Sequence, residues 1–210
     1  MLCLSLLAGL SGGATALAQT EAADKPFTTT ATVLILGDSI SAAYGMSLEE
    51  GWVALLARQL EQSPAPHLVV NASISGETSA GAAARLPALL RQHRPDVVVI
   101  ELGGNDGLRG YPIKRLRENL RNMVTLSQQA GAAVLILGME IPPNYGSRYT
   151  KQFRDSFATV AAQTDSALTP FMLAGIATDP ELMQADGIHP RPQAQQQLLD
   201  NVWPALAALL

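Results

Sequence analysis

The sequence contains one cysteine, Cys3, and only three histidines among its 210 residues. A single thiol excludes an intrachain disulfide. Cys3 also lies in an N-terminal segment that we expect to be removed, so the mature protein is predicted to lack a cysteine-based metal site. The histidines are not spaced as metal ligands, which argues against a metalloenzyme. We therefore expect a protein that works without a metal or other cofactor.

Charged side chains are also scarce. They make up 15% of the residues, the net charge is -4, and no run of Lys or Arg stands out. Neither nucleic acid nor an anionic membrane surface is therefore an expected partner. Hydrophobic residues reach 48%, which excludes a disordered chain. A chain of this length is sufficient for one domain with a sizeable core.

The first 18 residues carry no charged side chain and end in Ala16-Leu17-Ala18. An apolar stretch followed by small residues resembles the cleavage region of a secretory signal peptide, although no Lys or Arg precedes it. The stretch is too short, and too interrupted by Gly12-Gly13, to span a membrane. We predict a signal peptide over 1–18, a linker over 19–31 and a periplasmic or secreted domain over 32–210. No stable membrane insertion is expected once the signal is removed.

Short apolar runs alternate with amphipathic stretches along the rest of the chain. Strands are predicted over 32–36, 68–71, 96–102, 133–137 and within 167–173, and helices over 48–62, 80–92, 113–130, 149–163 and 193–209. Continuously apolar strands separated by helices predict a parallel sheet covered on both faces. The expected fold is a three-layer α/β/α sandwich, flavodoxin-like, with five strands in the order 2-1-3-4-5.

Polar motifs follow the first three predicted strands. Gly37-Asp38-Ser39 follows the first, Ser75-Gly76-Glu77 the second, and the GGNDG motif at 103–107 the third. With the first strand between the other two, these motifs meet at one edge of the sheet. A hydroxyl from Ser39, a backbone N–H from Gly76 and the Asn105 amide would converge there. Acyl transfer needs such a nucleophile together with donors for the developing oxyanion.

The base for this chemistry is predicted in Asp186-Gly187-Ile188-His189-Pro190, just before the last helix. The D-x-x-H spacing lets the carboxylate hold one ring nitrogen of His189 while the other faces Ser39. His67 and His93 are interpreted as solvated residues beside a strand and at a helix end. Asp38 and Asp106, which neighbour glycines in tight turns, are interpreted as acceptors that fix loops.

Taken together, these blocks resemble those of the SGNH/GDSL hydrolases, with Ser39 in GDSIS, Gly76 in SISGE, Asn105 in GGNDG, and Asp186 and His189 in DGIHP. The similarity extends over nearly all of 32–209 and is strongest to the thioesterase/lysophospholipase and arylesterase group. It implies the SGNH hydrolase fold and a serine esterase that acts through an acyl-enzyme on Ser39. It also implies His189 as base and acid, Asp186 as its orienting partner, and an oxyanion hole of Ser39, Gly76 and Asn105.

Two departures from the pattern are conservative: Ile40 stands where Leu is common in the family, and Glu77 where Asp is common.

The expected substrates are small acyl esters and thioesters, namely acyl-CoA, lysophospholipids and aryl or alkyl esters. The apolar residues expected to bind the acyl chain are Leu108, Tyr111, Ile141 and Pro142. Two alternatives remain open on the same fold: a carbohydrate O-deacetylase and a catalytically silent binding relative. An α/β-hydrolase is disfavoured because Ser39 is not in a G-x-S-x-G elbow.

Overall fold

The computed structural model describes residues 31–210, so the predicted signal peptide and all but the last residue of the predicted linker lie outside the described residues. Five parallel strands form one sheet in the order β2-β1-β3-β4-β5, which confirms the predicted topology. The strands are β1 (Ala31–Gly37), β2 (His67–Asn71), β3 (Val97–Glu101), β4 (Ala133–Leu137) and β5 (Ala167–Thr169).

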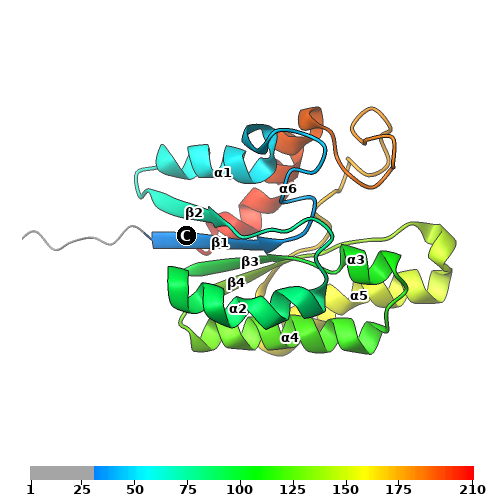
Figure 1. The fold of residues 1–210 in the computed structure, drawn as a ribbon, viewed down its shortest axis with the longest axis horizontal. Coiled ribbons are helices and arrows are strands. Elements are labelled where there is room, and N and C mark those ends of the chain that lie inside the picture. The colour runs from blue at the N-terminus through cyan, green and yellow to red at the C-terminus, as the bar shows by residue number, and fades with distance from the viewer. Residues whose placement is uncertain (1–30) are drawn as a thin grey trace, which may run out of the picture.

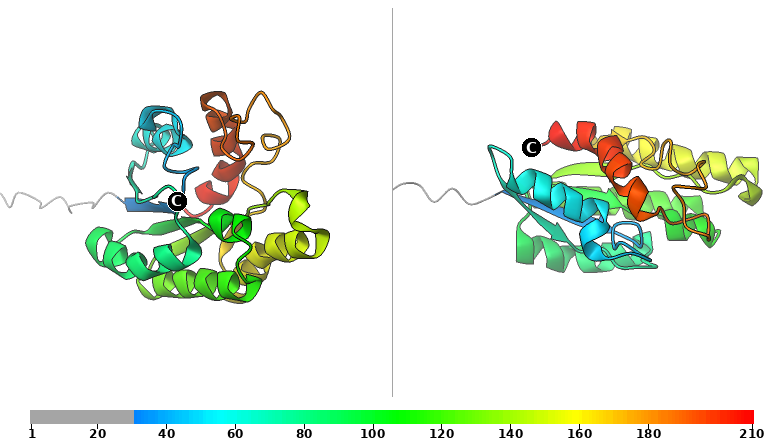
Figure 2. Two further views of the ribbon diagram at one scale, coloured as in Figure 1. Left: turned by 45° about the vertical axis from the view of Figure 1, so that its right-hand side comes forward. Right: turned by 90° about the horizontal axis from the view of Figure 1, so that it is seen from above.

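Helices cover both faces of the sheet, as Figures 1 and 2 show. Helices α1 and α6 pack together on one face, and α2, α4 and α5 lie side by side on the other. The helices are α1 (Trp52–Glu61), α2 (Ser79–His93), α3 (Gly104–Leu108), α4 (Ile113–Gln129), α5 (Ser147–Thr164) and α6 (Gln195–Ala207), with 3-10 turns η1 (Leu48–Glu50), η2 (Pro143–Tyr145) and η3 (Pro192–Ala194). Within residues 31–210, no helix has the length and apolar character needed to cross a membrane.

The central strands are apolar along their whole length because both of their faces are covered. Every residue from Val33 to Leu36 in β1 and from Val98 to Ile100 in β3 is fully buried. Trp52 and Leu56 of α1 pack against one face, and Phe153 of α5 packs against the other. Such continuous apolar strands are characteristic of a doubly covered parallel sheet.

Several predicted elements are shorter in the structure than expected, and two of them have a local backbone reason. The predicted helix over 48–62 divides into η1 and α1, because Gly51 between them has an extended backbone with ψ 151°. The predicted fifth strand ends at Thr169, because Pro170 follows and has no N–H to donate to a sheet.

The sheet brings the polar motifs to one edge. Strand β1 hydrogen-bonds to β2 on one side and to β3 on the other. Its following turn therefore lies between the segments that follow β2 and β3, at the carboxyl ends of the strands on the right of Figure 1. Ligands of open α/β sheets bind at this kind of switch point.

Candidate active site

Ser39 lies in a tight turn directly after β1. The N–H of Ile40 donates to Asp38 Oδ1 at 3.1 Å, and the N–H of Ala42 donates to the Asp38 carbonyl at 3.0 Å. Gly37 precedes this turn and must be a glycine, since a Cβ there would lie 2.6 Å from Oε2 of Glu101 and 2.8 Å from Ser41. The turn therefore presents the Ser39 side chain beyond the end of the sheet.

His189 reaches Ser39 from the segment between β5 and η3. Its carbonyl accepts from the N–H of Gln184 at 2.8 Å, and the Gln184 side-chain amide donates to the Tyr44 carbonyl at 2.8 Å. Gln184 thus joins the histidine loop to the serine loop. The rings of Tyr44 and His189 also pack together, with centroids 4.4 Å apart and planes tilted by 37°.

Ser39, His189 and Asp186 form a continuous hydrogen-bonded series. His189 Nε2 lies 2.9 Å from Ser39 Oγ, and Nδ1 lies 2.6 Å from Asp186 Oδ2. Burial acts to raise the pKa of Asp186, but hydrogen bonds from the His189 ring and from the N–H groups of Ile188 and His189 lower it to about 2. Because the ionised carboxylate only accepts, Nδ1 carries the proton and Nε2 accepts from the Ser39 hydroxyl. The imidazole is therefore oriented to remove that proton.

The three predicted oxyanion donors surround the same space. Ser39, Gly76 and Asn105 all line a cavity of about 240 Å³ together with His189. Gly76 has φ +79°, a backbone conformation that favours glycine. Asn105 donates one of its amide hydrogens to Asp38 Oδ2 at 3.2 Å, which leaves the second amide hydrogen available to a ligand.

Behind the serine turn lies a carboxyl group whose place in the sequence marks it only as part of a predicted strand. Glu101, at the end of β3, is fully buried, and its Oε2 accepts from the N–H groups of Asp38 and Ser41 at 3.0 and 3.3 Å. Its Oε1 has no partner within the described residues. Burial, together with the nearby negative charge of Asp38, raises the pKa of Glu101 well above its ordinary value. Glu101 thus braces the turn, and Asp38 in turn orients Asn105.

This buried acid predicts a pH-dependent stability. Since the folded protein holds the Glu101 proton more tightly than the unfolded chain does, this group's contribution to stability is complete below its ordinary pKa and is lost as the pH rises toward the folded value. Glu101→Gln cannot ionise. We therefore expect its melting temperature, relative to the unmodified protein, to rise as the pH is raised above about 5.

The control is Glu49→Gln, which changes an exposed carboxylate. Its melting temperature should follow that of the unmodified protein across the same pH range. If the melting temperatures of Glu101→Gln and the unmodified protein differed by the same amount at every pH, Glu101 would have the same protonation state in the folded and the unfolded protein.

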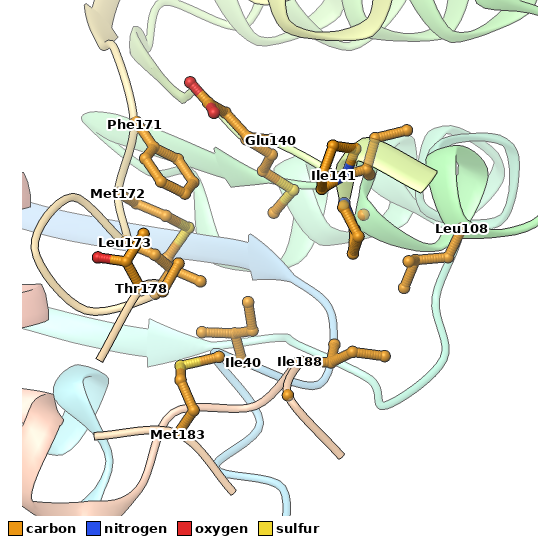
Figure 3. A pocket seen from close by; sticks show the side chains of 16 residues that line it. Ile40, Leu108, Glu140, Ile141, Phe171, Met172, Leu173, Thr178, Met183 and Ile188 are labelled. Carbon is orange, nitrogen blue, oxygen red and sulfur yellow. The ribbon is translucent and has the colours of Figure 1, made fainter. Parts of the chain in front are cut away.

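A second, apolar cavity of about 390 Å³, whose lining Figure 3 draws, shares part of that lining with the cavity around Ser39. Ile40, Gly104, Leu108 and Ile188 line both this cavity and the smaller one around Ser39. The remaining lining residues come from the segments after β4 and β5, and are Met139, Glu140, Ile141, Pro142, Pro143, Phe171, Met172, Leu173, Ala177, Thr178, Met183 and Gly187. Three of the four predicted acyl-binding residues, Leu108, Ile141 and Pro142, therefore line it. The fourth, Tyr111, does not, and lies exposed beyond α3.

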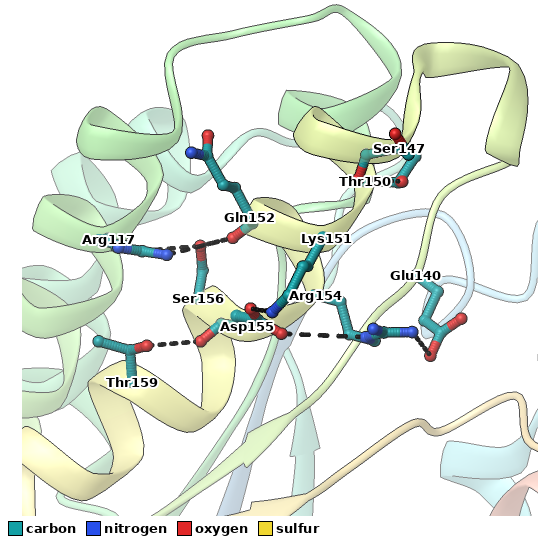
Figure 4. A network of polar contacts seen from close by, with 10 residues as sticks. All are labelled: Arg117, Glu140, Ser147, Thr150, Lys151, Gln152, Arg154, Asp155, Ser156 and Thr159. Atoms are coloured by element: carbon teal, nitrogen blue, oxygen red, sulfur yellow. Dashed lines mark hydrogen bonds and ion pairs between the residues drawn. The ribbon is translucent and has the colours of Figure 1, made fainter.

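The one charged side chain among the described residues of this lining, Glu140, is turned out of the cavity (Figure 3). Its carboxylate faces Arg154 on α5, with Oε1 3.8 Å from Nη1 (Figure 4). Arg154 also faces Asp155, which pairs with Lys151 one helical turn earlier. This network keeps the carboxylate at the protein surface, so the cavity presents an apolar wall to a ligand.

Asp106 and the other histidines lie apart from this chemistry. Asp106 is buried in α3 and accepts from the N–H and hydroxyl of Ser79 at 2.8 and 2.6 Å, so it joins α3 to α2. His67 begins β2 and His93 ends α2. In the part of the chain that the structure describes, no group of three or more His, Cys, Asp or Glu side chains is arranged to hold a metal ion.

Comparisons with known proteins agree with this geometry. The GDSL-like Lipase/Acylhydrolase family model matches residues 35–197. The chain is 54% identical over 179 residues to Esterase TesA of Pseudomonas aeruginosa, covering 85% of this chain and 89% of that protein. It is 45% identical over 170 residues to an Arylesterase of Vibrio mimicus, covering 81% of this chain and 85% of that protein. It is 44% identical over 169 residues to Thioesterase 1/protease 1/lysophospholipase L1 of Escherichia coli K12, covering 80% of each chain.

Solved structures of esterases also superpose closely on this chain. The crystal structure of TesA superposes with a TM-score of 0.83 at 54% identity, covering 85% of this chain and 99% of that one. A second similar structure is that of the psychrotrophic esterase EstA from Pseudoalteromonas sp., inhibited by monoethylphosphonate. It superposes with a TM-score of 0.81 at 46% identity, covering 84% of this chain and 97% of that one.

Proposed function

Since the chain belongs to the GDSL-like Lipase/Acylhydrolase family and is a serine ester hydrolase, we propose that it cleaves acyl esters and thioesters through an acyl-enzyme on Ser39. The observation that supports this most strongly is the series Asp186–His189–Ser39, with contacts of 2.6 and 2.9 Å, at the mouth of an apolar cavity. A silent binding relative would have no use for this alignment.

The proposed reaction has two halves. Ser39 Oγ attacks the carbonyl carbon while His189 Nε2 takes the hydroxyl proton, and the oxyanion accepts from Ser39 N–H, Gly76 N–H and the Asn105 amide. The bond to the leaving group then breaks, and His189 donates its proton to the departing alcohol or thiol. In the second half, water gives a proton to His189 and attacks the acyl-enzyme, which releases the carboxylic acid and restores Ser39.

Asn105→Ala tests the oxyanion donors. The amide meets full negative charge only in the transition state, so we expect kcat to fall by roughly 10²–10³-fold with a smaller change in KM. Steady-state kinetics on p-nitrophenyl butyrate measure both constants. The matched control is Asn119→Ala, which removes an amide that donates to Ser79 Oγ and does not line the cavity around Ser39. An unchanged kcat for Asn105→Ala would mean that this side chain only braces its helix against Asp38.

The proposed substrates carry medium-chain acyl groups, and their leaving group is an alcohol or a thiol. The reacting groups contact only the carbonyl, so oxygen and sulfur esters both fit. The acyl chain would occupy the cavity beside Ile40 and Leu108, where apolar contact gives only about 0.8 kcal/mol per buried CH₂. Discrimination between neighbouring chain lengths is therefore expected to be gradual, within roughly tenfold per step.

A panel of p-nitrophenyl esters from acetyl to palmitoyl, with an acyl-CoA and a lysophospholipid, tests this range. We expect octanoyl esters to react well and both additional substrates to be hydrolysed. Turnover confined to acetyl esters would refute the acyl-chain assignment and favour the O-deacetylase, for which a shallow cavity would suffice.

We further propose that residues 1–18 direct export and that the mature domain is periplasmic or secreted. The support is the uncharged apolar stretch ending in Ala16-Leu17-Ala18. N-terminal sequencing of the exported protein should begin at Gln19, and retention of Met1 in the cytoplasmic fraction would contradict the proposal.

A further inference from the structure

Large apolar side chains are exposed mainly at the edge of the sheet where the strands end and the active site lies. Eight are exposed within residues 31–210, and six of these lie in the segments that follow the strands. We call this set the rim: Tyr44, Leu48, Ile74, Tyr111, Tyr145 and Ile188, with exposed fractions from 36% to 63%. Each of the five segments that follow a strand contributes at least one of them. The other two are Leu68, at the opposite end of the sheet in β2, and the C-terminal Leu210.

We propose that the rim docks on the surface of a zwitterionic lipid aggregate, from which an acyl substrate passes directly into the cavity beside Ser39. Docking itself is independent of the proposed function, whereas passage of a substrate rests on it. Clustered apolar exposure of this kind marks an interaction surface, while scattered single residues do not.

The rim is continuous with the cavity that would receive the acyl chain. Ile188 lines both the apolar cavity and the space around Ser39. Tyr44 lines the same space and packs on His189, and the Tyr145 hydroxyl donates to the Leu108 carbonyl at 2.9 Å. A protein bound stably on this rim would close the mouth. A lipid surface instead brings acyl chains to it, so the lipid is the occupant compatible with turnover.

The charges near the rim favour neutral headgroups over anionic ones. Glu49 and Glu50 adjoin Leu48, Glu181 is exposed in the segment that carries Ile188, and the whole chain has a net charge of -4. Cations also lie near the rim. Arg109 Nη2 donates to the Gly76 carbonyl at 3.3 Å, and the exposed Lys114 and Arg148 follow Tyr111 and Tyr145 by three residues, so charges of both signs surround the rim. Three of the six rim residues are tyrosines, whose apolar rings and polar hydroxyls suit a lipid–water interface.

Flotation with vesicles tests the docking directly. The probe is diether phosphatidylcholine, which contains no carboxylic ester and therefore offers no bond for an acyl-enzyme mechanism to cleave. The test variant is Leu48→Ser with Ile74→Ser, because neither side chain lines the cavities. The matched control is Leu68→Ser, which removes an equally exposed leucine at the far end of the sheet, 56% exposed against 63% for Leu48.

We expect the unmodified protein and Leu68→Ser to float to the same extent, and the double variant to bind roughly tenfold more weakly. On micellar lysophosphatidylcholine the double variant should lose activity by a similar factor, while its kcat/KM on monomeric p-nitrophenyl butyrate stays within about twofold. Activity on the monomeric ester without flotation would overturn docking and leave the proposed function standing. Flotation without esterase activity would leave docking standing and overturn the proposed function.

Two further outcomes would overturn the proposal. Flotation only with vesicles that contain phosphatidylglycerol would assign the binding to charge and not to the rim. A concentration-dependent dimer in analytical ultracentrifugation, abolished in Leu48→Ser with Ile74→Ser but kept in Leu68→Ser, would identify a second copy of this chain as the occupant.

Discussion

Ser39→Ala is expected to lower kcat by roughly 10⁶-fold, because the covalent acyl-enzyme cannot form and the serine, histidine and aspartate act as a unit. The residual rate should still exceed that in water, since the oxyanion donors of Gly76 and Asn105 remain. The fold should be kept, because the hydrogen bond that the structure gives the Ser39 side chain is the one to His189. Kinetics on p-nitrophenyl butyrate, with circular dichroism as a check on folding, measure these effects.

Ser75→Ala provides the control for this experiment. Ser75 lines the same small cavity, but the structure gives its hydroxyl no bond to the imidazole. Its removal should leave kcat within about threefold of the unmodified value, the range of a surface substitution. An alkyl phosphonate should label Ser39 in the unmodified protein and nothing in Ser39→Ala. A label on any other serine would refute Ser39 as the nucleophile.

Much of the architecture was predictable because the buried strands have a distinctive hydrophobic pattern in the sequence. Runs such as Val33–Leu36 are apolar at every position, which is the signature of a strand covered on both faces. The pattern predicted a parallel sheet, and the order 2-1-3-4-5, assumed for that sheet, placed the polar motifs at one edge. The structure accordingly brings Ser39, Gly76, Asn105 and His189 around one cavity.

The residues that hold the site in place were harder to predict, since their roles depend on contacts distant in the sequence. Glu101 ends an apolar strand and gave no sign that it would meet the N–H groups of Asp38 and Ser41, some 60 residues earlier. Gln184 reaches the Tyr44 carbonyl across 140 residues. Tyr111 does not line the apolar cavity, because the glycine-rich segment after β3 coils into α3, which carries Leu108 toward the cavity and leaves Tyr111 beyond it.

Asp186→Asn is expected to lower kcat by roughly 10⁴-fold, the loss typical of a triad carboxylate replaced by its amide. The asparagine oxygen can still accept from the N–H groups of Ile188 and His189, as Asp186 Oδ1 does at 2.9 and 3.0 Å, so the loop should keep its shape. The asparagine NH₂ would face His189 Nδ1, however, and would force that nitrogen to accept. The proton would then lie on Nε2, which would donate toward Ser39 where it must accept.

Asp179→Asn is the matched control, because the Asp179 carboxylate likewise accepts from a loop N–H, that of Glu181 at 2.9 Å, but has no contact with the imidazole. It should retain kcat within about threefold. Since the pKa of Asp186 is about 2, its carboxylate stays ionised throughout the assay range, so Asp186→Asn removes a negative charge at every assay pH. A kcat for Asp186→Asn within tenfold of the unmodified value would show that Asp186 only shapes the loop and does not hold the histidine tautomer.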